Sequence, residues 1–144
     1  MGSEMCIRDS LETVARLQRI VRPSASYARS LAVLARAAAA GLRTKSGIIV
    51  GMGETDDEVI GALADLRGVG VSIVTIGQYL RPTARHLPVA RWVPPETFAW
   101  FKDAGEALGI PHVESSPLTR SSYHARQAAE GVGSGAPAPT VMFS

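Results

Sequence analysis

The sequence predicts an α/β protein with parallel strands and flanking helices. Short apolar runs rich in β-branched residues occupy 46–51 and 71–76. Between them lies a helix-length segment whose apolar residues recur every three or four positions. Strand, helix and strand at this spacing form a βαβ unit with parallel strands and a right-handed crossover. The length of 144 residues and the 46% of hydrophobic residues predict one soluble domain with a modest core.

Composition excludes several classes of function. A net charge of +2 is too small for an electrostatic footprint on nucleic acid, so no nucleic-acid partner is expected. No apolar stretch approaches the roughly 20 residues needed to span a bilayer, and no targeting segment is visible, so we expect a cytoplasmic protein. The single cysteine, Cys6, excludes an internal disulfide framework and a self-contained zinc or iron–sulfur site built from several thiolates.

The two ends of the chain differ in character from its middle. Residues 1–10 lack the apolar periodicity that begins at Leu11, and we treat them as a doubtful segment outside the fold. Residues 128–144 are rich in glycine, proline and small side chains, which predicts a flexible tail. The folded unit is therefore expected over 11–127.

Two helices are predicted before the first strand. The first ends at Pro23, and its apolar face consists of Leu11, Val14, Leu17 and Val21. The second ends at Gly41, and its apolar face consists of Tyr27, Leu31, Leu34 and Ala38.

Two further helices have clear starting signals. Thr55 and Glu58 have the spacing of a capping box, in which each side chain bonds the other's backbone N–H. The buried face of that helix is predicted to be Val59, Ile60, Leu63 and Leu66. The last helix opens at 94–96 and ends at Gly109, with an inward face made of Phe98, Phe101 and Leu108.

Two segments at the carboxyl ends of the predicted strands could bind a ligand. Residues 47–54 place glycines where a ligand can approach the backbone, ahead of a helix N-terminus that favours anions. The plainer alternative is a turn that needs glycine for positive φ. Gln78 and Tyr79, in the segment 75–82, would meet a ligand beyond the strand ends, or belong to an ordinary loop.

A third polar cluster occupies 120–125 and contains serine beside histidine. Ser122 and His124 are only two positions apart, with no Gly-x-Ser-x-Gly elbow and no acidic orienting residue, so serine-hydrolase chemistry is not expected. The alternative is a solvated C-terminal turn. His86 and His112 are isolated, which favours surface or packing roles over metal binding.

Taken together, these segments resemble one family, lipoyl synthase, whose members are radical S-adenosylmethionine enzymes. Six runs match in family order over roughly 11–127: LETV at 11–14, TKSG at 44–47, GMGET at 51–55, TIGQYL at 75–80, HLPV at 86–89 and RSSYHA at 120–125. The resemblance implies that this chain is the carboxyl-terminal half of a partial (β/α)6 barrel, similar to a TIM barrel. Arg8, Asp9 and Ser10 depart from the Asn-His-Asn that the family has before LETV.

The resemblance also implies an activity. The family inserts sulfur at carbon atoms 6 and 8 of an octanoyl group bound to a protein, in lipoate biosynthesis. It uses S-adenosylmethionine and two 4Fe-4S clusters, of which an auxiliary cluster supplies the sulfur. The implied partners are an octanoylated carrier, such as glycine cleavage H protein or a lipoyl domain of a 2-oxoacid dehydrogenase, and a reductant such as ferredoxin or flavodoxin. The family's cysteine triplets are absent here, so the chain alone is expected to be inactive.

The resemblance assigns roles to particular residues. The implied contacts to S-adenosylmethionine are Glu12, Lys45, Gly47, Ile49, Gly51, Glu54, Gln78, Tyr79 and Leu80. Ser122 matches an oxygen ligand of the auxiliary cluster, where a hard alkoxide would release iron more readily than thiolate. The implied supporting residues are Arg120, Ser121, Tyr123 and His124. Two alternatives stay open: a biotin-synthase-like sulfur-inserting enzyme, and a non-catalytic fragment that binds adenosine or S-adenosylmethionine.

Overall fold

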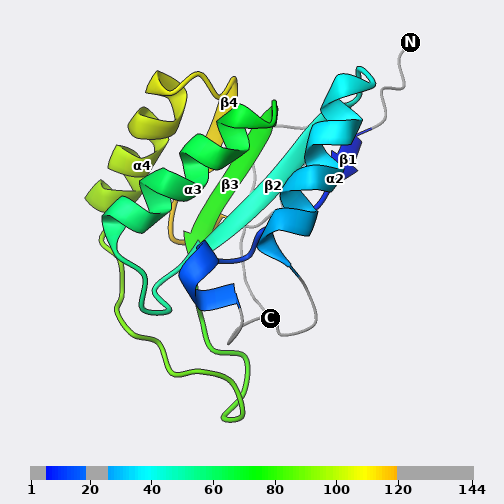
Figure 1. Cartoon of the computed structure of the whole chain (residues 1–144). Helices are drawn as coiled ribbons and strands as arrows, with labels where there is room; N and C mark the ends of the chain where they lie inside the picture. Colours follow the sequence, from blue (N-terminus) through cyan, green and yellow to red (C-terminus); the bar gives the residue numbers. More distant parts are fainter. Residues whose placement is uncertain (1–5, 19–25, 120–144) are drawn as a thin grey trace, which may run out of the picture.

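The computed structural model describes residues 6–18 and 26–119 (Figure 1). Its elements are β1 (Cys6–Arg8), the 3-10 turn η1 (Ala15–Leu17), α2 (Tyr27–Ala39), β2 (Arg43–Val50), α3 (Asp56–Gly68), β3 (Ile73–Gln78), α4 (Pro95–Ala107) and β4 (His112–Ser115). The four strands form one parallel sheet in the order β1-β2-β3-β4. Helices α2, α3 and α4 lie on the same face of this sheet (Figure 1).

The predicted βαβ unit is confirmed in β2, α3 and β3. The register of the two strands runs from Lys45 opposite Ile73 to Val50 opposite Gln78. β2 begins three residues before the predicted run and ends one residue before its end, and β3 is displaced by two residues toward the C-terminus. β4 had no signal in the sequence, because His-Val-Glu-Ser is short and mostly polar. The strand forms because its backbone pairs with the free edge of β3, and its one apolar side chain, Val113, is buried.

The core lies between the sheet and the three helices. Alternate strand residues face the helices and are buried: Ile48, Val50, Val74, Ile76 and Val113. Phe98 and Phe101 are buried as predicted and pack edge to face, with ring centroids 6.3 Å apart. Leu108 is exposed, so its prediction as an inward residue is wrong. Gly105 is buried in its place, and a Cβ there would lie 3.0 Å from Cγ2 of Val113.

The first predicted helix is not present in the described residues. Residues 11–14 are not helical and bend at Glu12 and Thr13, and only the single turn η1 follows them. Glu12 has a φ of 70° and pairs with β2: its N–H donates to the Gly47 carbonyl at 3.0 Å, and its carbonyl accepts from Ile49 N–H at 2.8 Å. Leu11, Val14 and Leu17 are buried as predicted, but the backbone that carries them has a different conformation from the predicted helix. Val21 and Pro23 lie outside the described residues.

The segment expected to lie outside the fold contributes an edge strand. Residues 6–8 pair with 43–45, which supplies partners for backbone groups along β2. Between Arg8 opposite Lys45 and Glu12 opposite Ile48, four residues advance along one strand against three along the other, as in a β-bulge. The Ser46 hydroxyl fills this bulge by donating to the Asp9 carbonyl at 2.9 Å. Leu11 N–H donates to the same hydroxyl at 3.2 Å.

The predicted capping box is confirmed at the start of α3. Glu58 N–H donates to the Thr55 hydroxyl at 3.1 Å, and Thr55 N–H donates to Glu58 Oε1 at 2.9 Å. Val59, Leu63 and Leu66 are buried, and Ile60 is half-buried. α2 ends with Gly41 just beyond it at a φ of 84°, also as predicted. Side-chain signals at helix ends were therefore more reliable than apolar periodicity alone.

Candidate functional site

The glycine-rich segment and the Gln-Tyr segment meet at the carboxyl end of the sheet. Val50 and Gln78 are partners at the ends of β2 and β3. Beyond them, Tyr79 N–H donates to the Val50 carbonyl at 2.8 Å, and Ala90 N–H donates to the Gly51 carbonyl at 2.7 Å. The loop after β2 therefore lies against both ends of the long connection between β3 and α4. In parallel α/β folds this edge of the sheet is where ligands bind.

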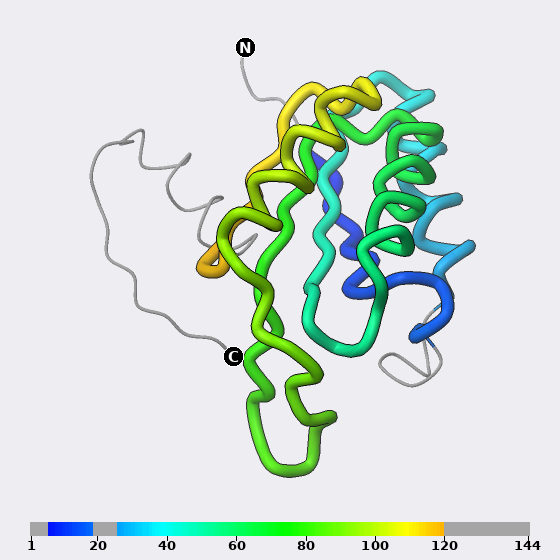
Figure 2. The backbone as a smooth tube through the Cα atoms, turned by 90° about the vertical axis from the view of Figure 1, so that its left-hand side faces the viewer, coloured from blue at the N-terminus to red at the C-terminus, as the bar shows by residue number. Residues whose placement is uncertain are grey.

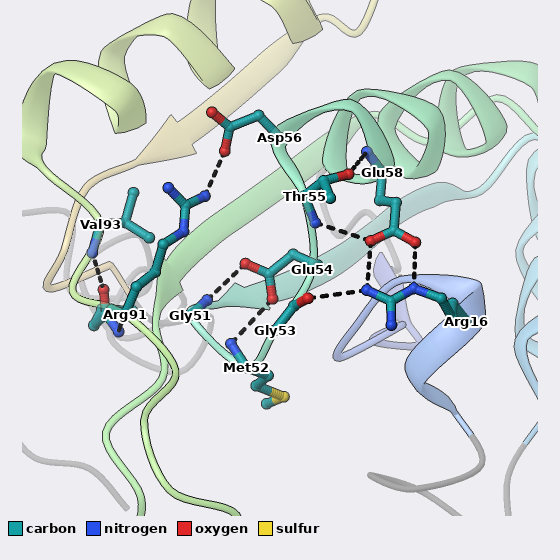
Figure 3. Close-up of polar contacts among 11 residues, drawn as sticks. Arg16, Gly51, Met52, Gly53, Glu54, Thr55, Asp56, Glu58, Arg91 and Val93 are labelled. Carbon is teal, nitrogen blue, oxygen red and sulfur yellow. Dashed lines mark hydrogen bonds and ion pairs between the residues drawn. The ribbon is translucent and has the colours of Figure 1, made fainter.

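Glu54 is buried beneath the loop that follows β2. Its carboxylate accepts from Gly51 N–H at 2.8 Å and from Met52 N–H at 3.0 Å (Figure 3). Only 5% of the residue is exposed. The two charge-assisted bonds fix the backbone of the loop, so in this structure the carboxylate is a clamp on its own turn. Arg16 holds the same turn from outside, with Nη2 donating to the Gly53 carbonyl at 2.9 Å.

Gln78 joins the two sides of the long connection. Its Nε2 donates to the carbonyls of Tyr79 at 3.0 Å and Arg91 at 3.1 Å. Its Oε1 accepts from Val93 N–H at 2.9 Å. Gly51 has a φ of 103°, and a Cβ there would lie 2.4 Å from Gln78 Nε2. The glycine is therefore required both by backbone conformation and by the close approach of this amide.

Tyr79 and Leu80 differ in environment although they are neighbours. Tyr79 is only 8% exposed, and its hydroxyl donates to the Leu87 carbonyl at 2.7 Å. Burial raises the pKa of the Tyr79 phenol, so the hydroxyl stays protonated and continues to donate. Leu80 is 38% exposed. Tyr79 thus anchors the connection, and Leu80 is available to a ligand or partner.

Three of the implied nucleoside contacts lie together on β2 and the segment beside it. Glu12 pairs by its backbone with Gly47 and Ile49, as described above. Glu12 and Ile49 are half-buried, so each side chain presents part of its surface. Gly47 is buried in the strand between Ser46 and Ile48. This arrangement places a carboxylate and an aliphatic side chain near the same stretch of strand.

Lys45 lies apart from this group. It precedes Val50 by five strand residues, which places it about 16 Å from the carboxyl end of the sheet. It is 7% exposed and stands between Arg8 and Ile73 in the register. Burial, with a smaller contribution from Arg8, lowers the pKa of the Lys45 ammonium.

The polar cluster at 120–125 lies outside the described residues, and with it Arg120, Ser121, Ser122, Tyr123 and His124. The described chain leads toward the strand ends immediately before this cluster. Ser116 N–H donates to the Ile76 carbonyl at 3.2 Å, and Gln78 N–H donates to the Pro117 carbonyl at 3.4 Å. Thr119 crosses over Gly77, where an added Cβ would lie 2.2 Å from the Thr119 carbonyl oxygen.

Ion pairs that the sequence did not reveal surround the loop after β2. Arg16 Nε lies 2.7 Å from Glu58 Oε2, and Arg91 Nη2 lies 2.5 Å from Asp56 Oδ1 (Figure 3). Arg16 lowers the pKa of Glu58 to about 2, helped by the Thr55 backbone N–H. These pairs join residues far apart in sequence, so the sequence could not predict them. It shows only that carboxylates gather at the start of the helix, where they suit the helix dipole.

Two buried polar side chains near η1, those of Gln18 and Thr13, also had no signal in the sequence. Gln18 donates through Nε2 to the carbonyls of Leu11 at 2.7 Å and Thr13 at 3.0 Å. Its Oε1 and the Thr13 hydroxyl oxygen have no hydrogen-bond partner in the structure. Across residues 6–18 and 26–119, no three His, Cys, Asp or Glu side chains are grouped so that they could hold a metal ion. No helix among these residues is long and apolar enough to cross a membrane.

Comparison with solved structures supports the α/β fold. The HMG-CoA lyase from Brucella melitensis matches with a TM-score of 0.51 over 91% of this chain and 47% of that chain. At 16% identity, this likeness concerns the fold alone, and the neighbour is TIM-barrel-like. It does not establish the particular barrel that the sequence resemblance implies.

Comparison with curated proteins identifies the family, although no family model matches the chain. Lipoyl synthase from Rubrobacter xylanophilus is 52% identical over 129 residues, which is 88% of this chain and 40% of the relative. The protein from Kineococcus radiotolerans is 56% identical over 81% of this chain and 35% of the relative. Chloroplastic lipoyl synthase 1 from Zea mays is 56% identical over 81% and 33%. The chain spans about two fifths or less of these relatives' lengths, and it belongs to the lipoyl synthase family.

Proposed function

We propose that this chain forms part of the S-adenosylmethionine site of a lipoyl synthase. The reaction is the insertion of two sulfur atoms at carbons 6 and 8 of a protein-bound octanoyl group. The observation that carries the proposal is the identity of 52–57% to proteins named lipoyl synthase, over more than four fifths of this chain. Because these relatives are lipoyl synthases by name, a biotin-synthase-like reaction is not favoured.

The described residues fit S-adenosylmethionine in part. Glu12 and Ile49 have exposed surface near the carboxyl half of β2, and a carboxylate suits ribose hydroxyls while an aliphatic side chain suits the adenine face. Glu54 and Gln78 hold the neighbouring loops, so we assign them the positioning of the site rather than direct contact. When bound, S-adenosylmethionine supplies the precursor of the radical that removes hydrogen from carbon. The protein's own task is to position and enclose the reactants.

The described residues do not fit an iron–sulfur cluster. No suitable group of ligands occurs among them, and Cys6 is the sole cysteine of the whole sequence. No step of the reaction is therefore assigned to a cluster held by this chain alone. Ser122, three positions beyond Thr119, is proposed as one oxygen ligand of the auxiliary cluster in a complete enzyme. The support is its match to the family run and the approach of residues 116–119 to β3.

The complete enzyme would need a protein substrate and an electron donor. We propose an octanoylated carrier domain and a small ferredoxin or flavodoxin in these roles, as the family resemblance implies. The cytoplasm is the proposed location of a bacterial enzyme of this kind. One relative, from Zea mays, is named as chloroplastic, so the location differs among members of the family.

A hybrid enzyme tests the proposed function. Residues 11–127 of this chain would replace the matching segment of the Rubrobacter xylanophilus relative, which supplies the rest of a complete protein. After anaerobic iron and sulfide reconstitution, the hybrid is incubated with octanoylated H protein, S-adenosylmethionine and a reductant. Mass spectrometry of the H protein then measures conversion of octanoyl to lipoyl groups.

The predicted result is conversion that requires S-adenosylmethionine. Circular dichroism and iron analysis of the hybrid serve as controls for folding and cluster content. A folded, iron-loaded hybrid that leaves the octanoyl group unchanged, while the unmodified relative converts it under the same conditions, would contradict the proposal.

A further inference from the structure

The connection between β3 and α4 projects beyond the carboxyl end of the sheet. Residues 80–92, called the projecting loop below, form the long segment that extends away from the sheet in both views (Figures 1 and 2). The loop begins two residues after Gln78, the last residue of β3. It therefore stands at the edge of the sheet where the candidate site lies, and a molecule that approaches this edge would meet it.

The projecting loop is basic and contains no acidic residue. Its cations are Arg81, Arg85 and Arg91, and it also contains His86. Arg91, at the base, pairs with Asp56. Arg81 and Arg85, which are exposed, form no ion pair with the other described residues. The whole chain has a net charge of only +2, so this loop concentrates positive charge at one place.

The same loop also exposes apolar side chains. Six large hydrophobic residues are exposed in the described part of the chain, and three of them are in the loop. These are Leu80 at 38%, Leu87 at 36% and Trp92 at 66% exposure. Arginine and tryptophan beside aliphatic side chains are the composition of protein–protein contact centres.

Internal hydrogen bonds hold the projecting loop in one conformation. Arg81 has a φ of 45°, and its guanidinium donates to the carbonyls of Ala84 at 2.9 Å and His86 at 3.0 Å. The Thr83 hydroxyl lies 2.9 Å from His86 Nδ1. At the base, Gln78 and Tyr79 bond to the carbonyls of Arg91 and Leu87. A preorganised loop loses little conformational entropy on binding, which favours recognition of a rigid partner.

We propose that the projecting loop is the docking element for the carrier protein, and that it recognises a face with carboxylates around an apolar patch. The inference rests on the proposed function, because that function requires a folded protein to deliver an acyl chain to this edge of the sheet. Arg85 would meet the carboxylates, and Leu87 and Trp92 would meet the apolar patch. Charge complementarity would accelerate encounter and set orientation, and the apolar contacts would slow dissociation.

Calorimetric titration tests the proposal with an H protein that has a negative net charge and no octanoyl or lipoyl group. The titration is made with the full 144-residue chain and repeated with the hybrid enzyme described above. Arg85→Glu reverses the exposed charge, and Trp92→Ser removes the aromatic contact. The matched control is Arg36→Glu, which reverses an exposed charge in the last turn of α2, at the other end of the sheet. Circular dichroism checks the folding of each variant.

The expected dissociation constant rises with salt, and Arg85→Glu raises it about tenfold, whereas Arg36→Glu changes it by less than about twofold. Arg85→Glu should also make the dissociation constant less dependent on salt. Trp92→Ser should weaken binding but leave that salt dependence unchanged. The inference is overturned if neither folded wild-type protein binds, or if Arg85→Glu and Trp92→Ser bind as tightly as Arg36→Glu. The probe undergoes no reaction, so docking can fail while the hybrid still inserts sulfur, and sulfur insertion can fail while docking holds.

Discussion

Two polar side chains at the carboxyl end of the sheet, the buried Glu54 and the half-buried Gln78, hydrogen-bond to backbone groups of the neighbouring loops. Glu54 receives the N–H groups of two consecutive loop residues, and Gln78 uses both ends of its amide on the connection to α4. From sequence alone, a carboxylate or amide just beyond a strand end is predicted to contact a ligand. The distinction depends on which backbone groups lie nearby, and those groups belong to a loop whose path the local sequence does not fix.

Replacement of Glu54 tests its role as a clamp. Glu54→Ala leaves the buried N–H groups of Gly51 and Met52 without an acceptor, so the free energy of unfolding should fall by about 2–4 kcal/mol. Glu54→Gln keeps one acceptor oxygen and should lose less. Urea unfolding followed by circular dichroism gives both values. Equal stability of wild type and Glu54→Ala would contradict the assigned role.

Two glycines provide a matched pair at the residue scale. Gly51→Ala combines a positive φ with a collision against the Gln78 amide and should destabilise the fold by about 1–3 kcal/mol. Gly61→Ala, within α3, meets no atom within 4 Å and should stabilise the fold by about 0.5–1 kcal/mol. Thermal melts of the two variants should therefore shift in opposite directions, and a shift in the same direction would count against this conformation of the loop.

At the scale of elements, prediction succeeded where a side chain determines the local backbone. The capping box of α3 is a contact between residues three apart, so its chemistry is visible in sequence. The segment 11–17 has helical apolar spacing, yet the edge of β2 offers Glu12 hydrogen bonds that outweigh this preference. β4 depends on a strand edge supplied by residues about 40 positions away. The bonds of Gln78 had no local signal for a related reason, because the groups it contacts are brought in by the long connection, and its contact with a ligand stays a prediction.

The start of α3 should make stability depend on pH. Arg16 lowers the pKa of Glu58 in the folded chain from 4.5 to about 2, so the fold is favoured above the unfolded pKa and loses this contribution as the pH falls below it. Wild type should therefore lose more stability than Glu58→Gln between pH 5 and pH 2.5, as measured by urea unfolding at each pH. The pair lies at the surface, with the Arg16 side chain 55% and the Glu58 side chain 27% exposed, so added salt should reduce the difference. Parallel pH profiles for the two proteins would contradict the assignment.

At the scale of the whole molecule, the chain has one parallel sheet with helices on one face and spans a minor part of its relatives. The fold class followed from local patterns. The family followed from six runs distributed along the chain, and no single run would have been sufficient. The candidate site could be located at the strand ends from sequence, but its direct contacts could not be separated from supporting residues.

The chain alone should bind S-adenosylmethionine very weakly. Glu54 and Gln78 are engaged by backbone groups, and Glu12 and Ile49, the side chains proposed to contact the nucleoside, would cover only one side of it. Isothermal titration of the 144-residue protein should therefore show no saturable heat. Saturable binding of one equivalent would instead support a self-sufficient binding module.

Sulfur insertion by the hybrid enzyme, compared with its Ser122→Ala and Leu118→Ala variants, tests most sharply whether this chain supplies part of a lipoyl synthase site. Leu118 is exposed and has no assigned role, so its variant controls for changes near the same segment. We expect lipoyl formation by the hybrid and by Leu118→Ala, and its loss in Ser122→Ala with the radical cluster retained. Unchanged lipoyl formation in Ser122→Ala, or none in any folded and iron-loaded hybrid, would contradict this expectation.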